Sequence, residues 1–593
     1  MIKKLLGFVC FLACTTWSYS QCNLKSIPLD NQVKNATQII EGKVVGKHSL
    51  WDVDKKNIYT LNTIEVYKIF KGTTSLRTLE IITPGGIVGL QAEVANPSLN
   101  LKIGDIGSFL LINNTVKINS NRTAKIFKPY ASLQSFYKYN LSENKVANVF
   151  STESGISTNF YNTLKRLTAN KVKVIKPLKF NKIRNQSTSG VLQNKAFGVT
   201  SISPSTTTAG TKSVVTISGT DFGANQGEVK FSDADDGGSS FYTALDSEII
   251  SWTNTEIQVE VPSRAGTGPI QVVNTAGETV TSNFDLTLSW AEINVNSDAV
   301  MAGTPVSYVT QLINTNGSGG YTWQMFTDFD ANTPAKEAFI RSLNSWRCET
   351  GVNWIMGDPT TIDATDGDGV NVVRFDNGAE LPNGNLGVCI SRYNGCLVSG
   401  GTSIDWFVGE LDIIFNDDIN WEFGPALPAS NAFDFETVSV HELGHGHQLT
   451  HVIDTNKIMH FALGNGVSNR NLAADDINGA NNVQIRNTTN APCNQSSMTN
   501  FDCNSLSVDA VAFDAQLLIY PNPVTTSLNI KNTSQVAITQ AIIYDVRGRL
   551  ITTLNSGLSK ELISIDTSTF NSGLYFLKLE SSNSTITKKF IVK

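Results

Sequence analysis

One stretch of the chain carries the strongest structural signal: Phe433-Asp-Phe-Glu-Thr-Val-Ser-Val-His441-Glu442-Leu-Gly-His445-Gly-His447-Gln-Leu-Thr-His451. Five of the six histidines of the chain lie between His441 and His460, a clustering that core packing does not require. The apolar positions predict a buried helix, and Asp434 would favour its N-terminus. Residues four apart share one face of a helix, so His441 and His445 would project toward one point. The spacing therefore predicts two metal ligands on a rigid element.

A third ligand is needed, because catalytic zinc takes three protein ligands and leaves one position for water. No glutamate occurs between Glu442 and Glu561, which excludes families that use a downstream glutamate. Glu442 itself is displaced by about 100° from His441, so it can act on a water instead of ligating. His451 stands six residues after His445, where a turn would bring it back to the metal. We therefore favour His451 over the other candidates, Asp454, Asp475 and Asp476.

The motif His441-Glu-Leu-Gly-His445, with His451 and then Ile458-Met459, resembles the metzincin zinc peptidases, in which Met459 would form the structural methionine turn. The resemblance is to the matrixins and covers residues 290–490, so it implies an α+β metzincin-like catalytic domain. It also implies zinc held by His441, His445 and His451. The reaction would be peptide hydrolysis by a zinc-activated water, with Glu442 as general base.

Three residues near the motif need separate interpretation. The related families have glycine at the position of Gln448, where the chain leaves the helix, often with positive φ. A non-glycine residue there costs about 1 kcal/mol, which concerns the geometry of the loop more than the ligand set. His447 would lie about 200° from His445, which favours a supporting or surface role. His460 fits a cleft-lining residue and an ordinary turn residue equally well.

An acidic, glycine-containing loop precedes the motif. Asp363, Asp366 and Asp368 crowd this loop, and clustered oxygens with glycine turns suit Ca²⁺. The twelve-residue EF-hand pattern with its closing glutamate is absent, so a solvated acidic loop is slightly favoured over a calcium site.

Composition and processing signals indicate a secreted protein. Residues 1–20 predict a signal peptide, and no later run approaches the ~20 apolar residues of a membrane span. The net charge of -6 argues against nucleic acid. Six cysteines remain after signal removal and suggest disulfides, which sequence alone cannot assign among 15 pairings. Proximity along the chain suggests one disulfide between Cys389 and Cys396 and another between Cys493 and Cys503.

The 593 residues are too many for one core, so we expect a multidomain chain with immunoglobulin-like β-sandwiches beside the catalytic domain. Residues 197–289, with Ile217-Ser-Gly-Thr-Asp-Phe-Gly, resemble an IPT/TIG domain. Residues 515–593, with Ile519-Tyr-Pro-Asn-Pro, resemble the C-terminal sorting domain of type IX secretion. The other predicted segments are a β-rich N-terminal domain at 21–164 that is hypothesised to be a pro-segment, a basic linker at 165–196 and a linker at 491–514.

These features together predict a secreted zinc metalloendopeptidase that acts on extracellular proteins and meets the export machinery through its C-terminal domain. The alternative is a non-catalytic surface adhesin whose metal only stabilises the fold. Retention of Glu442 argues against the adhesin, because a structural metal site does not need that carboxylate. The substrate is not specified by the sequence.

Overall fold

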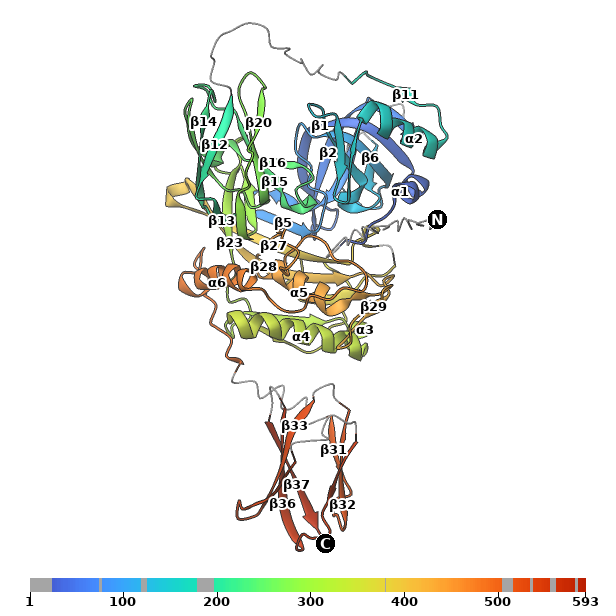
Figure 1. Ribbon diagram of the computed structural model, residues 1–593, viewed down its shortest axis with the longest axis vertical. Coiled ribbons are helices and arrows are strands. Elements are labelled where there is room, and N and C mark those ends of the chain that lie inside the picture. Colours follow the sequence, from blue (N-terminus) through green and yellow to red (C-terminus); the bar gives the residue numbers. More distant parts are fainter. Residues whose placement is uncertain are drawn as a thin grey trace, which may run out of the picture. The chain divides into compact units, whose positions relative to one another are not determined.

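The computed structural model describes residues 24–73, 77–118, 125–178, 197–378, 380–503, 516–533, 537–554, 562–581 and 585–593. The chain divides into two compact units, residues 1–501 and 502–593, and each is described by itself (Figure 1). The predicted signal peptide and Cys22 lie outside the described residues.

The N-terminal domain is built around a closed ring of five strands. Strand β1 pairs with β2 on one side and with β6 on the other, and β3 and β7 complete the ring. Alternate side chains point inward, so that Ile40, Ile64 and Phe109 are fully buried. The ring strands are β1 (Gln38–Trp51), β2 (Ile58–Lys71), β3 (Thr78–Pro84), β7 (Ile126–Pro129) and β6 (Ile106–Asn113), and β8 (Phe136–Asn140), β9 (Lys145–Asn148) and β10 (Ser151–Ser154) continue from β6.

The segment predicted as a basic linker is partly packed on this domain. Its first residues belong to helix α2 (Tyr161–Thr168), and β11 (Lys173–Val174) pairs with β2. Lys176 forms an ion pair with Glu65 of β2. Residues 179–196 of the predicted linker lie outside the described residues.

A hairpin of the N-terminal domain joins a sheet that belongs to residues 290–490, a part of the chain called the histidine domain below. The hairpin consists of β4 (Gly86–Val88) and β5 (Gln91–Asn96). β5 pairs antiparallel with β27 (Gly387–Val398), and Cys389 lies opposite Asn96. The N-terminal domain therefore contributes strands to the sheet of the histidine domain, which the sequence did not predict.

Residues 198–291 form the predicted β-sandwich. One sheet has the order β12-β14-β18-β17 and the other β16-β15-β19-β20, while β13 pairs with β21. Strand β14 buries Val215 and Ile217 and β15 buries Val229 and Phe231, so the two sheets meet through alternate apolar residues. The strands are β12 (Gly198–Ser203), β13 (Thr206–Ala209), β14 (Val214–Thr220), β15 (Glu228–Asp233), β16 (Phe241–Thr243), β17 (Ile249–Trp252), β18 (Glu256–Glu260), β19 (Ala265–Val273), β20 (Thr279–Thr281) and β21 (Thr287–Ala291).

The histidine domain has a mixed sheet of order β25-β24-β26-β28-β27, followed by β5 and β4 of the hairpin. β24, β25, β26 and β28 all run parallel to one another. β27 runs antiparallel to β28. β22 and β23 complete the sheet beside β28. The strands are β22 (Asn294–Ser297), β23 (Val306–Gln311), β24 (Tyr321–Met325), β25 (Trp354–Met356), β26 (Asn371–Phe375) and β28 (Ser403–Phe415).

Two long helices pack together in this domain. Helix α4 (Thr333–Thr350) starts at Asn332, whose side chain caps the helix, and has proline in its first turn. It buries Ala335, Phe339, Leu343 and Trp346, which share one face of the helix. Trp346 donates to the carbonyl oxygen of Val440 at 2.7 Å and so links α4 to α5 (Phe435–Gly446). Helices α3 (Thr327–Ala331) and α6 (Ala474–Thr489) complete the domain.

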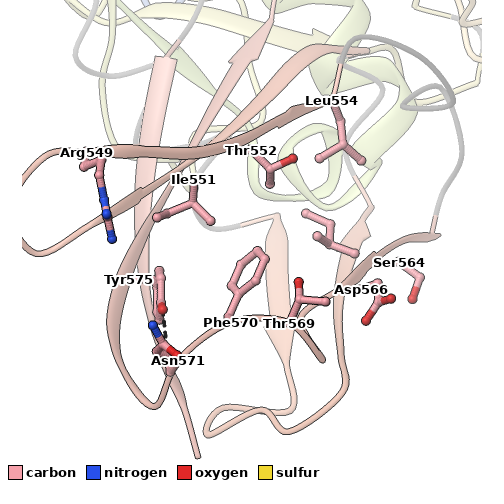
Figure 2. A pocket seen from close by; sticks show the side chains of 11 residues that line it. Arg549, Ile551, Thr552, Leu554, Ser564, Asp566, Thr569, Phe570, Asn571 and Tyr575 are labelled. Carbon is pink, nitrogen blue, oxygen red and sulfur yellow. Dashed lines mark hydrogen bonds between the residues drawn. The ribbon is translucent and has the colours of Figure 1, made fainter.

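The C-terminal unit has two sheets with a core of its own. Their orders are β31-β32-β35 and β34-β33-β36-β37. One hollow on this unit is lined by Arg549, Phe570 and Tyr575, and the Tyr575 hydroxyl donates to the Asn571 carbonyl at 2.8 Å (Figure 2). The strands are β31 (Leu517–Tyr520), β32 (Ser527–Asn532), β33 (Ile538–Asp545), β34 (Leu550–Leu554), β35 (Leu562–Asp566), β36 (Gly573–Ser581) and β37 (Thr585–Val592).

The cysteine pairings predicted from proximity are wrong. Cys396 is bonded to Cys493, with 5.7 Å between their Cα atoms, and Cys389 is a buried free thiol. Cys389 and Cys396 lie on the same strand, where seven residues span about 23 Å, far beyond the ~7 Å that a disulfide allows. Cys348 and Cys503 are also disulfide-bonded. Among the described residues, no helix is both long and apolar enough to cross a membrane.

Candidate metal centre

Three histidines converge at the end of helix α5. Ring nitrogens of His441, His445 and His451 all lie within 4.8 Å of one another, and all three residues are buried. His441 and His445 come from the same face of α5, and His451 comes from the loop after it. Within the described part of the chain, this is the only group of three or more His, Cys, Asp or Glu side chains close enough to share a metal ion.

Each ring is oriented through its Nδ1 atom. Nδ1 of His441 lies 2.7 Å from the carbonyl oxygen of Ile458, and Nδ1 of His445 lies 2.9 Å from that of Leu449. A carbonyl oxygen only accepts, so both Nδ1 atoms carry the proton and both Nε2 atoms present lone pairs. Nδ1 of His451 lies 2.8 Å from a carboxylate oxygen of Asp235, which belongs to the β-sandwich.

The arrangement fits a metal ion for two reasons. The Nε2 atoms of His441 and His445 lie 3.0 Å apart with their lone pairs facing each other, an arrangement that a shared cation stabilises. Nε2 of His451 is buried and has no hydrogen-bond partner in the part of the chain that the structure describes. Burial, followed by the charges of neighbouring histidines, lowers the pKa of His441 well below its ordinary value and that of His445 to about 3. Three buried imidazoles whose Nδ1 atoms are each held by an oxygen are a donor set that suits zinc.

Glu442 follows His441 on α5, and its carboxylate lies against Gly387 of β27. Its side chain is fully buried, and neither carboxylate oxygen has a hydrogen-bond partner among the described residues. Burial raises its pKa well above the ordinary value, and the backbone N–H of Cys389, which lies near the carboxylate without forming a full hydrogen bond, offsets only part of this. Space for the carboxylate exists because residue 387 is glycine, where a Cβ atom would lie 2.7 Å from Oε1 of Glu442.

The methionine of the predicted turn packs beneath this region. Met459 is buried, and a Cβ atom at Gly444 of α5 would collide with its sulfur. Asp476 holds the turn, because its carboxylate accepts from the backbone N–H of Ile458 at 3.0 Å and of Ala473 at 2.9 Å. Asp476 is therefore committed to the turn and is not among the converging groups, and Asp475 is paired with Lys457 at 2.7 Å.

Gln448 has the positive φ that the related families assign to glycine. Its φ is 70°, and its side chain is fully buried. The hydroxyls of Thr310 and Tyr393 each donate to Oε1 of Gln448 at 2.9 Å. Nε2 of Gln448 lies within 3.4 Å of the carbonyl oxygens of His445 and Gly446. The side chain thus compensates for backbone strain by bridging the end of α5 to two strands.

The remaining predicted residues lie elsewhere. His447 is buried, with its ring 5.6 Å from those of Trp346 and Trp354, and Nε2 bonds Thr350 at 3.0 Å. His460 is buried beside Phe461. The structure does not gather the aspartates of the acidic loop within the described residues. Asp363 pairs with Arg374, Asp366 with Lys56, and Asp368 accepts from the Val370 backbone N–H.

Asp235 and Gly387 were not found from the sequence. Asp235 precedes its partner His451 by 216 residues, and a lone aspartate in a predicted sandwich gives no signal of such a contact. Gly387 opposes Glu442 only because β27 packs against α5.

Comparison with known proteins identifies three domains. Residues 405–484 match the family model of Matrixin, residues 198–288 that of the IPT/TIG domain, and residues 518–593 that of the secretion system C-terminal sorting domain. Each range lies inside the segment for which the sequence predicts that domain. No curated protein gives a significant match.

Solved structures give only weak similarities. A Bacteroides vulgatus protein described as a bacterial DNA-binding protein has 11% identity and a TM-score of 0.14, with 35% of this chain and 72% of its own covered. A gamma-CGTase from Alkalophilic bacillus clarkii has 13% identity and a TM-score of 0.13, with 41% and 26% covered. The BSP domain of a biofilm-associated protein has 9% identity and a TM-score of 0.16, with 94% and 81% covered. We draw nothing from scores this low. The three family matches show that the chain combines a matrixin domain, an IPT/TIG domain and a type IX secretion sorting domain, and that it is a secreted or cell-surface protein.

Proposed function

We propose that this protein is a secreted zinc-dependent endopeptidase, with His441, His445 and His451 as zinc ligands and Glu442 as general base. The observation that carries the proposal is the convergence of three buried histidine rings, together with the buried carboxylate of Glu442, the residue after His441, whose oxygens have no hydrogen-bond partner among the described residues. A purely structural metal site would leave Glu442 buried and unpaired at a cost of several kcal/mol without any return.

The residues of the site divide the chemistry between them. Zinc held by the three Nε2 atoms would polarise a peptide carbonyl and make water acidic near neutral pH. Glu442 would accept the proton of the attacking water and deliver it to the leaving amine. A cation close to Glu442 favours its charged form, which opposes the effect of burial on its pKa. Gly387 keeps the space in which this carboxylate moves.

We also propose that the N-terminal domain is a pro-segment that keeps the enzyme latent. Extended peptides commonly bind by adding a strand to an exposed sheet edge. Strand β27 lies beside Glu442, and its outer edge from Cys389 to Asn394 is already paired with β5. An isolated antiparallel β-bridge between Leu24 and Asn385, just before β27 begins, extends the part of this edge that the N-terminal segment covers. A substrate strand would therefore compete with the chain's own hairpin.

Release of the hairpin would require cleavage after the N-terminal domain. Residues 165–184 contain eight basic residues and no acidic one, a composition that suits a processing segment. Cleavage there would separate the hairpin from the histidine domain in sequence.

The test uses the full chain with a specific protease site inserted within residues 185–190. Casein digestion and bound zinc are measured before and after cutting, for wild type, Glu442→Gln, His445→Ala and the control Glu436→Gln. Glu436 lies on the same helix but pairs with Arg341 at 2.8 Å, outside the metal centre.

We expect cut wild type and Glu436→Gln to bind zinc and digest casein. Glu442→Gln should bind zinc without digesting casein, and His445→Ala should lose both. Equal digestion by Glu442→Gln and wild type would refute the general base. Zinc binding with no digestion in any variant, together with binding to host matrix proteins, would favour the adhesin.

A further inference from the structure

We propose that the IPT/TIG domain supplies a positioning residue, Asp235, which orients the third histidine of the metal centre. The inference rests on the zinc site proposed above. His441 and His445 are held by main-chain carbonyls of residues close to them in sequence, Ile458 and Leu449. His451 instead depends on a carboxylate from another domain, at 2.8 Å from its Nδ1 atom.

Asp235 is fixed by its own surroundings. It lies in the short 3-10 helix η3 (Ala234–Asp236) between β15 and β16, where the Asp233 side chain accepts from its backbone N–H at 3.1 Å. One of its oxygens faces His451, and the other pairs with Nε of Arg264 at 2.9 Å. Arg264 also pairs with Asp233, the residue that caps the turn, at 2.6 Å. One guanidinium therefore holds the capping residue and Asp235 together. The carboxylate therefore cannot swing away from His451 without breaking an ion pair.

The ion pair with Arg264 places a cation 2.9 Å from the Asp235 carboxylate, on the side away from His451. A carboxylate acceptor at Nδ1 fixes the proton there and increases the basicity of the opposite nitrogen, Nε2. This Nε2 of His451 is buried and has no hydrogen-bond partner among the described residues.

The contact is part of a continuous interface between the two domains. A Cβ atom at Gly237 would approach the ring of Phe461 to 2.5 Å, and one at Gly266 would approach Ile453 equally closely. Both apolar partners follow His451 in the same loop. Lys457 donates to the Ser289 carbonyl at 2.7 Å at the end of the sandwich. The sandwich therefore shapes the loop that carries the third ligand.

The proposed role of Asp235 predicts how much zinc affinity its loss would cost. Loss of a carboxylate that orients a zinc-binding histidine typically reduces metal affinity by about 10- to 100-fold. Asp235→Ala should therefore raise the dissociation constant for zinc by that factor. Asp235→Asn keeps an oxygen acceptor but loses the charge, so it should fall between wild type and Asp235→Ala.

The experiment measures zinc affinity of the full chain by competition with a chelator, for wild type, Asp235→Ala, Asp235→Asn and Asp236→Asn. Asp236 is the matched control, because it lies on the same turn and accepts from the Ser240 backbone at 3.1 Å instead of facing a histidine. Digestion of casein by the cut enzyme is followed at limiting and at excess zinc. Unfolding of the metal-free proteins is measured alongside.

We expect Asp236→Asn to match wild type, and the activity lost by Asp235→Ala at limiting zinc to return in excess zinc. A purely structural role would lower the stability of the metal-free protein without that rescue. An unchanged zinc affinity in Asp235→Ala would refute the role of Asp235 and leave the proposed function standing. Absence of zinc binding in wild type and in Asp236→Asn would refute the proposed function itself. If Asp235→Ala does not fold, the isosteric Asp235→Asn decides the question through its affinity.

Discussion

Replacing Gln448 by glycine, the residue of the related families at this position, should destabilise this protein. The left-handed backbone at Gln448, with φ of 70°, costs a non-glycine residue about 1 kcal/mol, and glycine would remove that cost. The substitution would also remove an acceptor that takes hydrogen bonds from Thr310 and Tyr393, both at 2.9 Å.

The losses exceed the gain. Each of the two hydrogen bonds contributes about 1 kcal/mol. The Thr310 hydroxyl also lies 3.2 Å from the Ile293 carbonyl oxygen, so the buried Tyr393 hydroxyl is the one that loses its acceptor, which adds about 1 to 3 kcal/mol. Subtracting about 1 kcal/mol of relieved strain leaves Gln448→Gly less stable than wild type by about 2 to 4 kcal/mol. Gln448→Ala loses the same hydrogen bonds but keeps the positive φ, so it should be about 1 kcal/mol less stable than the glycine variant.

Urea unfolding followed by tryptophan fluorescence checks both numbers, since Trp323, Trp346, Trp354 and Trp406 are fully buried in the histidine domain. The difference between the alanine and glycine variants isolates the backbone term, and the difference between alanine and wild type isolates the side-chain term. A glycine variant at least as stable as wild type would show that the buried amide contributes no more than the backbone strain costs. Equal stabilities of the two variants would show that the backbone at this position is not strained.

Three further predictions follow from neighbouring contacts. Gly387→Ala should displace the Glu442 carboxylate, lowering kcat/KM for a peptide substrate by about 10- to 100-fold while bound zinc stays stoichiometric; an unchanged rate would contradict the contact. Burial raises the pKa of Glu93 on β5 to about 7, so the stability that this carboxyl contributes is fully present below about pH 4.5 and falls by about 3 kcal/mol as pH rises through 7. Glu93→Gln should remove this pH dependence in urea unfolding, and parallel profiles would refute the buried acid. Val94→Pro should break a hydrogen bond of the β5–β27 ladder. The uncut variant should therefore digest casein at a rate closer to that of the cut wild type. A variant that digests casein no faster than uncut wild type would argue against latency through the hairpin.

The parts of the site that sequence analysis found are those encoded by local geometry. His441 and His445 share a helical face because they are four residues apart, and α4 buries the residues that a 3.6-residue period selects. His451 came from elimination among downstream residues, and the structure brings it to the other two. The strand alternation of the IPT/TIG domain was equally readable, because one face of each strand must enter the core.

The parts that were missed depend on distant pairings. Nothing in the sequence near Gln91–Asn96 says that this strand will pair with β27, because an edge accepts any extended segment of suitable twist. The disulfide between Cys396 and Cys493 spans 97 residues, whereas proximity along the chain suggested shorter loops. The positive φ of Gln448 was expected from the related families, but its anchoring by Tyr393 requires knowing that β27 passes the end of α5.

The order of domains along the chain separates the two domains that contact the histidine domain, one through the pairing of β5 with β27 and the other through Asp235 at His451. The N-terminal domain lies before the basic segment that begins at residue 165, and the IPT/TIG domain lies after it. One cut between residues 179 and 196 would free the hairpin that occupies β27. The same cut would leave Asp235 covalently joined to the histidine domain, where Ile293 donates to the Gln448 carbonyl and Thr450 to that of Ala291 at 2.9 Å each. A domain that orients a ligand has to remain after processing, whereas a domain that blocks the substrate edge has to leave. The position of the basic segment satisfies both requirements, because it divides the blocking domain from the orienting one.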